Sequence, residues 1–239
     1  MTATTKLYEE DSYLRECSAE ITDSQPGKIR LNQTILYAES GGQLPDHGAI
    51  TLPNGDTFNV VDSQKAPGNP SAIWHTLEND QQIIPPQTPV TVTLDWERRY
   101  QLMRMHTAMH LLCACVTGSV TGGAVNIGRG RIDFNVPPDS INKEKLHAQL
   151  NALIEQNIPA TPRWVSESEL DNNPSLVRTM SVSPPRGAGR IRLLDIADTD
   201  LQPCGGTHVK HTGEIGALVV GKIENKGRQN RRVNIRFAE

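Results

Sequence analysis

Two short segments far apart in the chain carry pairs of residues that bind metal ions. HTAMH places His106 and His110 four residues apart, and CGGTH places Cys204 and His208 at the same spacing. Residues four apart on a helix lie on one face, so both imidazoles of the first pair can reach one ion. Either pair alone is a weak signal, because one pair cannot hold zinc. Together they supply three nitrogens and one sulfur, a set that suits zinc by number and softness, and the sequence predicts one Zn²⁺ site.

The first pair lies in a predicted helix, DWERRYQLMRMHTAMHLLCACV, which begins after Asp95. Aspartate is a favourable helix cap, and the apolar residues that follow recur at helical spacing. Because the hydrophobic period changes here, we expect a domain boundary at this point, with domains of residues 1–94 and 95–239.

The residues before Asp95 have the pattern of short strands and turns. The candidate strands are KIRLNQTILYA, DTFNVV, SAIWHTL and PVTVTL, and the glycine-rich SGGQLPDHG interrupts them. Short alternating segments separated by turn residues are typical of an antiparallel sheet. We therefore expect a small antiparallel β-barrel.

The residues after the helix predict a mixed domain. AVNIGRGRIDFNV has the pattern of a strand pair, and RIRLLDI, EIGALVVGKIE and RRVNIRF predict further strands. PPDSINKEKLHAQLNALIEQN predicts a second helix capped by Asp139 or Ser140, with Leu146, Leu150, Leu153 and Ile154 on one face. The fold class expected for the whole chain is α+β.

Composition narrows the functional class. The chain has 239 residues, 36% hydrophobic and 21% charged, with no basic start followed by an apolar run and no stretch long enough to span a membrane. The cytoplasm is therefore the expected compartment. Four cysteines are too few for a disulfide scaffold, so we expect thiols, with Cys113 and Cys115 packing within their helix.

Charge is unevenly distributed along a chain whose net charge is −3. Between residues 222 and 236, six lysines and arginines accompany a single acid, and Arg231 and Arg232 are adjacent. A local basic face of this kind is compatible with tRNA binding through Arg231 and Arg232. The alternative is an ordinary solvated strand and turn.

Three segments, HTAMHLL, CGGTHVKHTGEIG and YAESGGQLPDHG, resemble the editing domains of alanyl-tRNA synthetases and the freestanding AlaX proteins, which are alanyl-tRNA editing hydrolases. The resemblance covers nearly the whole chain. It implies an N-terminal glycine-rich barrel followed by an α/β-sandwich editing domain whose zinc ligands are His106, His110, Cys204 and His208. The implied partner is the acceptor end of alanine tRNA carrying serine or glycine. Nothing in the sequence resembles a nucleotide-binding segment, so no ATP-dependent step is expected.

The resemblance also suggests substrate contacts. Thr121 is the first candidate for recognising the serine hydroxyl and Thr107 the second, although both could be structural hydroxyls. Gly41, Gly42 and Gln43 form the loop that the family associates with substrate handling, and a simple hairpin turn is the alternative. Catalytic zinc needs an open or exchangeable position, whereas four protein ligands close the tetrahedron. The sequence leaves this point open, together with the identity of any general base.

Three other functions fit parts of the sequence. A zinc-stabilised RNA-binding module without catalysis would use the same ligands and basic tail. A threonyl-type editing domain shares the zinc motifs but does not come with a glycine-rich barrel. A metallopeptidase or small-molecule esterase is disfavoured, because HTAMH lacks the glutamate of HExxH. The other histidines, including His75, have no motif support as ligands.

Overall fold

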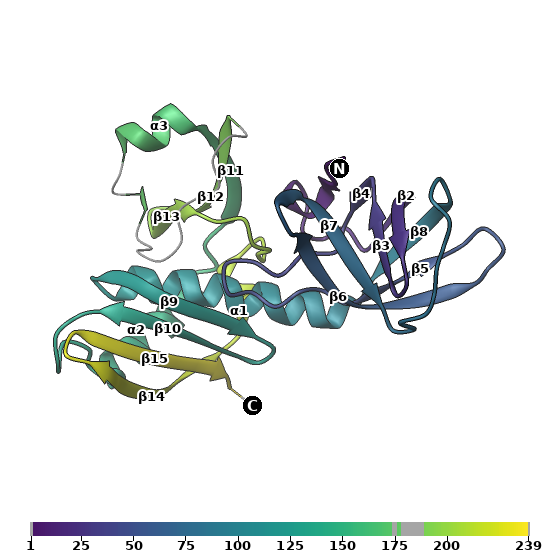
Figure 1. Cartoon of the computed structure of the whole chain (residues 1–239). Helices are drawn as coiled ribbons and strands as arrows, with labels where there is room; N and C mark the ends of the chain where they lie inside the picture. Colours follow the sequence, from purple (N-terminus) through teal and green to yellow (C-terminus); the bar gives the residue numbers. More distant parts are fainter. Residues whose placement is uncertain (1, 174–175, 178–188, 239) are drawn as a thin grey trace. The chain divides into compact units, whose positions relative to one another are not determined.

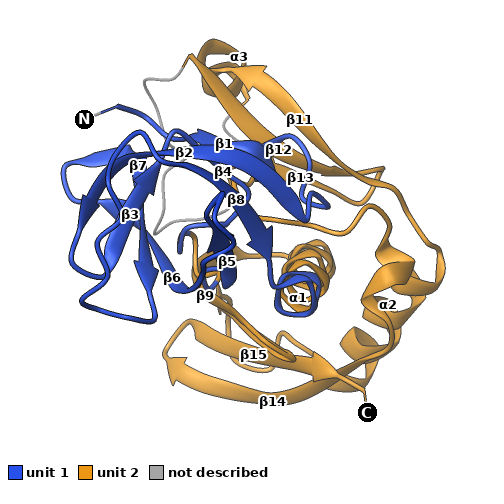
Figure 2. Ribbon diagram, turned by 90° about the vertical axis from the view of Figure 1, so that its right-hand side faces the viewer, with its two compact units in different colours: residues 1–40, 44–100 blue, residues 41–43, 101–239 orange. Residues whose placement is uncertain are grey.

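A computed structural model describes residues 2–173, 176–177 and 189–238, and it confirms the α+β fold (Figure 1). Contacts divide the chain into two compact units (Figure 2). The first consists of residues 1–40 and 44–100, and the second of residues 41–43 and 101–239. The boundary expected between residues 94 and 95 therefore lies inside the first unit. None of the described helices is long and apolar enough to span a membrane.

The first unit contains a closed barrel of six antiparallel strands, as predicted. Its strands close in the order β2 (Glu16–Gln25), β3 (Lys28–Leu31), β7 (Asn69–Leu77), β6 (Thr57–Ala66), β5 (Gly48–Thr51) and β8 (Pro89–Leu94). Fully buried aliphatic side chains such as Ile21, Ile29, Ile50 and Val92 fill its interior. Two further strands, β1 (Thr5–Lys6) and β4 (Gln33–Thr34), pair in parallel, and the short helix η1 (Leu7–Glu9) follows β1.

The helix α1 (Trp96–Cys115) begins with the predicted cap. The carboxylate of Asp95 accepts a hydrogen bond from the backbone N–H of Arg98 at 3.1 Å. One turn later, Arg99 is fully buried, forms an ion pair with Asp46 and donates to the carbonyl of Ser12 at 2.8 Å. These contacts explain why the first turn of α1 belongs to the first unit.

The second unit contains an antiparallel four-stranded sheet in the order β14 (Leu218–Gly227), β15 (Asn230–Phe237), β10 (Arg129–Asn135) and β9 (Ser119–Asn126). The later turns of α1 and the helix α2 (Lys143–Glu155) lie on one face of this sheet (Figures 1 and 2). Gly130 permits the close approach of α1, because a Cβ there would lie 2.7 Å from the Met109 sulfur. All four strands had been predicted, although the predicted first strand began at Ala124 and β9 begins at Ser119. β9–β10 and β14–β15 pair as hairpins, whereas β10 and β15 are far apart in the sequence.

The predicted cap of α2 is wrong. Asn142 is the N-cap, and its side-chain oxygen accepts from the backbone N–H of Lys145 at 2.8 Å. Asp139 instead has a positive φ of 58°, and the Ser140 hydroxyl donates to the carbonyl of Pro137. Both residues belong to the turn before the helix, since several adjacent polar residues offered caps of similar quality.

A second sheet of the same unit leads to the CGGTH segment. It consists of β11 (Ala160–Ser166), β12 (Arg190–Ile196) and β13 (Asp200–Pro203), with the short helix α3 (Glu167–Asn172) after β11 and η3 (Thr212–Ile215) after the segment. Only β12 was predicted. β11 has four exposed residues, one of them a proline, and β13 has only four residues in all, so neither has a clear strand pattern. Because β13 ends at Pro203, Cys204 is the first residue after this sheet.

Candidate metal centre

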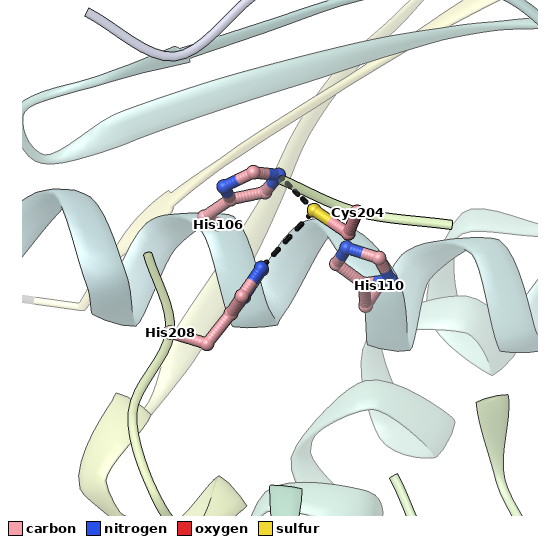
Figure 3. Close-up of side chains that lie close together, drawn as sticks. All are labelled: His106, His110, Cys204 and His208. Atoms are coloured by element: carbon pink, nitrogen blue, oxygen red, sulfur yellow. Dashed lines mark hydrogen bonds between the residues drawn. The ribbon is translucent and has the colours of Figure 1, made fainter. Parts of the chain in front are cut away.

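The four predicted ligand residues come together in the second unit. His106 and His110 project from the same face of α1, while Cys204 and His208 lie in the loop after β13 (Figure 3). One donor atom from each residue lies within 4.8 Å of the other three. The three histidines are buried and Cys204 is partly exposed.

The distances around Cys204 fit a metal ion bound among these donors. Its sulfur lies 3.5 Å from Nε2 of His106 and 3.1 Å from Nε2 of His208. Tetrahedral zinc with ordinary Zn–S and Zn–N bond lengths separates a sulfur and a nitrogen ligand by about 3.6 Å. The cluster could therefore hold a metal ion, and its three nitrogens and one thiolate are the donors that zinc prefers.

Each imidazole contacts a different polar residue through its other nitrogen. His106 Nδ1 lies 2.7 Å from the amide oxygen of Gln43, and His110 Nδ1 lies 2.8 Å from a carboxylate oxygen of Asp200. Both oxygens accept hydrogen bonds only, so Nδ1 must carry the proton when the ring is neutral. This tautomer leaves Nε2 available to a metal. The corresponding neighbour of His208 is the Thr107 hydroxyl, at 3.3 Å.

The charges of the cluster favour a thiolate. Burial opposes ionisation of Cys204, but the three surrounding imidazoles outweigh it and hold the pKa of the thiol well below its ordinary value. Burial likewise opposes protonation of His110, yet the Cys204 thiolate and the Asp200 carboxylate raise its pKa to about 10. For His208, burial dominates and lowers the pKa. A thiolate with its negative charge balanced by neighbouring groups is the form in which cysteine binds metals.

The two glycines of CGGTH differ in their surroundings. A Cβ at Gly206 would lie 2.1 Å from Cε1 of His106, whereas a Cβ at Gly205 would have nothing within 4 Å. Arg192 holds the loop by donating to the carbonyls of Cys204 and Gly206, each at 2.9 Å. Gly206 is therefore required for the approach of His106, while Gly205 is exposed beside the partly exposed Cys204.

The two threonine candidates occupy different environments. Thr107 is fully buried; its hydroxyl donates to the carbonyl of Met103 at 3.0 Å and accepts from the N–H of Val209 at 3.2 Å. Thr121 is partly exposed at a bulge in β9, and its hydroxyl donates to the carbonyl of Asp133 at 3.1 Å. Among the described contacts, none joins Thr121 to the four ligand residues.

The segment Gly41–Gln43 lies against β9. The N–H of Val125 donates to the carbonyl of Gly42 at 2.7 Å, and Gln43 forms a parallel bridge with Val125. Gly41 and Gly42 have positive φ, and a Cβ at Gly42 would lie 2.6 Å from the carbonyl oxygen of Gly123. A simple hairpin turn, the alternative for this segment, does not account for its contacts with β9 and with His106.

The two candidate tRNA-binding arginines have partners within the chain. Arg232 forms a bidentate pair with Asp133, at 2.7 and 2.8 Å, which lowers the pKa of that carboxyl. Arg231 is buried and donates to the side chain of Asn225 and to the carbonyls of Gly227 and Asn230. Arg231 thus stabilises the β14–β15 hairpin, and Arg232 joins β15 to β10.

Sequence reasoning missed Asp200, Gln202 and Arg192. Asp200 contacts His110, and the amide of Gln202 donates to the same carboxylate oxygen at 2.7 Å. A signal was present in DLQPC, because alternate residues of a strand lie on one face and Asp200, Gln202 and Cys204 are alternate. Recognising it required β13 to be predicted.

Comparisons with known proteins show to which family the chain belongs. Residues 191–234 match the family model of the threonyl and alanyl tRNA synthetase second additional domain, and residues 4–98 match that of the class II (A) tRNA synthetases. The alanyl-tRNA editing protein AlaX-M of Methanosarcina acetivorans is 32% identical, over 95% of this chain and 96% of its own length. The chain belongs to the AlaX-M family of alanyl-tRNA editing proteins.

Two further relatives show the extent of the family likeness. AlaX-M of Saccharolobus solfataricus is 30% identical over 96% of this chain and 97% of its own length. The alanine–tRNA ligase of Sulfurisphaera tokodaii is 31% identical over 92% of this chain but only 25% of its own length. The chain is therefore similar to the AlaX-M proteins over nearly their whole length, and to the ligase over a quarter of its length.

Proposed function

We propose that the chain is a zinc-dependent hydrolase that cleaves the ester between a wrong amino acid and the terminal ribose of alanine tRNA. Its main substrate would be the serylated tRNA and its second the glycylated one, in the cytoplasm and without ATP. The observation that carries the proposal is the convergence of His106, His110, Cys204 and His208 in a family of alanyl-tRNA editing proteins.

The need for such a reaction follows from the chemistry of amino acid selection. An apolar pocket built for alanine rejects an analogue that merely adds a hydroxyl by only about 100-fold, and smaller glycine fits wherever alanine fits. A separate site that recognises the hydroxyl can sort the products by the opposite criterion.

The chain's own residues would divide the work as follows. His106, His110 and His208 would present Nε2, and Cys204 its thiolate, to hold zinc in a buried position. When bound, zinc supplies Lewis acidity toward an ester carbonyl or a water molecule. The partly exposed Cys204 and the exposed Gly205 mark the side from which the acceptor end would approach. Gly41, where a Cβ would meet nothing within 4 Å, would leave room for the substrate, while Gly42 would hold the segment against β9.

Thr121 is the proposed reader of the serine hydroxyl. Its hydroxyl hydrogen is donated to a backbone carbonyl, so its oxygen retains acceptor capacity for the hydroxyl of serine. The Thr107 hydroxyl, by contrast, has polar neighbours on three sides in a fully buried position. This difference supports Thr121 over Thr107.

Deacylation assays test the proposal. The full chain, loaded with zinc, is incubated with serylated, glycylated and correctly alanylated alanine tRNA, and separately with a free seryl ester. Rapid hydrolysis of the serylated tRNA, with slow hydrolysis of alanyl-tRNA and of the free ester, supports the proposal. Binding without hydrolysis of any of the three tRNAs contradicts it and identifies a zinc-stabilised RNA-binding module.

The Thr121→Val variant tests the reading of the hydroxyl. One hydrogen bond between neutral groups is worth about 0.5 to 1.5 kcal/mol, which corresponds to roughly a two- to tenfold preference for the serylated tRNA. We expect the ratio of seryl to alanyl deacylation rates to narrow by a factor in this range, with zinc content unchanged. An unchanged ratio would transfer the role to another residue.

The β14–β15 hairpin, which carries Arg231 and Arg232, is the proposed tRNA contact. Because both arginines have partners within the chain, the test also needs a variant that disturbs no such partner. Replacing the exposed Arg228 removes a positive charge from the hairpin turn, whereas Arg232→Ala also leaves Asp133 without its bidentate partner. If the hairpin contacts phosphates, Arg228→Ala and Arg232→Ala will both weaken tRNA binding and flatten its salt dependence. Unchanged binding over a salt series for both variants would restrict these arginines to a structural role.

A further inference from the structure

Gln43 is fully buried, and both polar atoms of its side chain contact the ligand segments. Its Oε1 lies 2.7 Å from His106 Nδ1 and accepts from the backbone N–H of Thr207 at 3.2 Å, while its Nε2 donates to the Thr207 hydroxyl at 2.9 Å. The amide orientation follows from chemistry, because a backbone N–H can only donate and must face the oxygen. Nδ1 of His106 therefore carries a hydrogen and donates it to Gln43.

This contact determines which nitrogen of His106 can bind a metal. With Nδ1 protonated, Nε2 has a free lone pair, and it is the nitrogen that lies 3.5 Å from the Cys204 sulfur. The amide of Gln43 also connects His106 on α1 to Thr207, which directly precedes the ligand His208. One side chain thus orients a ligand of the first motif and contacts the second.

The surroundings hold Gln43 in this position through main-chain contacts. The Gly42 carbonyl accepts from Val125 N–H, and the bridge between Gln43 and Val125 fixes the direction of the backbone. On the other side, Gly206 leaves room for the amide, because a Cβ there would lie 2.9 Å from Gln43 Oε1. A glutamine held this way is closed to solvent, which does not suit a residue that must reach a substrate.

We propose that Gln43 is a positioning residue for the metal centre, which fixes the tautomer and ring orientation of His106 and joins the two ligand segments. The proposal deepens the function proposed above and rests on its metal site. The molecule contains a parallel arrangement in Asp200, whose carboxylate accepts from Nδ1 of His110. Outer partners of this kind orient the ligand and raise its basicity.

Zinc affinity of the full chain, without tRNA, tests the proposal. Metal-free wild type and variants compete with a chromogenic chelator for zinc, and circular dichroism checks that each metal-free variant is folded. Gln43→Met keeps the length of the side chain but removes the acceptor, and we expect its zinc affinity to fall roughly 10- to 100-fold. Wild-type affinity in this variant would overturn the proposal.

Two further variants distinguish positioning from packing. Gln43→Glu keeps an oxygen that accepts from His106, and its carboxylate raises the basicity of the ring, so it should bind zinc at least as tightly as wild type. Thr207→Val removes the partner of Nε2 but leaves the contact with His106, so its affinity should fall less than that of Gln43→Met. A folded Gln43→Glu chain that binds zinc more weakly than wild type would overturn the proposal even if Gln43→Met fails to fold.

The absorption of bound Co²⁺ gives a second measurement. Its visible bands report the geometry of the four ligands, and we expect them to shift in Gln43→Met and to keep the wild-type tetrahedral intensity in Gln43→Glu. A wild-type chain that binds no zinc would refute the metal site of the proposed function itself. Equal affinities of wild type and Gln43→Met would refute only the role of Gln43.

Discussion

Buried histidines occur in both units, and their environments separate a structural imidazole from a candidate ligand. His75, on β7 of the barrel, is fully buried with Nδ1 2.7 Å from the Ser63 hydroxyl, and its Nε2 has no hydrogen-bond partner among the described residues. His106 is nearly as buried, but Gln43 holds its Nδ1 and its Nε2 faces Cys204. Burial alone therefore does not identify a ligand. What identifies it is a second donor atom opposite the available nitrogen.

The charges differ in the same way. Burial, with no acid to offset it, lowers the pKa of His75 to about 4 and keeps that ring neutral. For His110, the Cys204 thiolate and Asp200 outweigh burial and raise the pKa to about 10. The two units therefore place buried imidazoles in opposite electrostatic environments, and experiments on both can test this distinction.

The largest expected effect is loss of the metal when a ligand is removed. Wild type should contain about one zinc per chain, and His106→Ala or Cys204→Ala should weaken zinc binding at least about 100-fold, because each removes one of four donors. His75→Leu, the matched change in the barrel, should leave zinc content unchanged. Metal analysis by mass spectrometry after dialysis decides the point, and a Cys204→Ala chain that retains tightly bound zinc would contradict it.

Adding one methyl group should have very different effects at the two glycines beside the site. Gly206→Ala places a Cβ 2.1 Å from the His106 ring, so the ring must move and zinc binding should weaken nearly as much as on loss of a ligand. Gly205→Ala, one residue earlier, meets nothing within 4 Å and should bind zinc as wild type does. Zinc titration of both variants measures the difference, and equal affinities would show that the His106 ring adapts.

The outer partner of His110 should matter less than a ligand. Asp200→Leu leaves Nδ1–H of His110 and the amide of Gln202 without an acceptor, and we expect zinc affinity to fall roughly 10- to 100-fold. Asp200→Asn retains an acceptor oxygen and should lose less. Chelator competition ranks the variants, and an Asn variant as weak as the Leu variant would show that the carboxylate charge, rather than the hydrogen bond, supports the ring.

The smallest expected effect is a pH dependence that belongs to His75. Its pKa in the folded chain, about 4, lies below the unfolded value of about 6.5, so the folded state binds fewer protons. The stability that its neutral form contributes is complete above pH 6.5 and declines as the pH falls toward 4. By pH 5 the stability lost in this way amounts to about 2 kcal/mol.

A variant isolates this contribution from that of the carboxylates. The free energy of unfolding of His75→Leu should fall by about 2 kcal/mol less than that of wild type when the pH falls from 7 to 5, whatever its value at pH 7. Urea unfolding at both pH values, on the full chain, gives the comparison. Parallel losses in the two proteins would mean that water reaches the His75 ring.

Local patterns predicted the elements whose information lies in adjacent residues. The helix α1 and its cap at Asp95 followed from periodicity and from one side chain, as did the barrel strands β6, β7 and β8. The same reasoning failed to predict the N-cap of α2 between residues 139 and 142. Neighbouring polar side chains there can each cap the helix, and the geometry of the turn selects among them. β11 and β13 were missed because short strands with exposed or proline residues carry little periodic signal.

The sequence by itself determined the four candidate ligand residues and their donor types. Helix geometry alone brings residues four apart onto one face, so His106 and His110 form a pair wherever α1 lies. Only the tertiary structure decided which groups support them. Gln43 is 63 residues from His106, and Asp200 is 90 from His110. Contacts over such separations depend on how sheets and loops pack, which no local spacing encodes, and the same packing decided that Gly206, rather than Gly205, must lack a side chain.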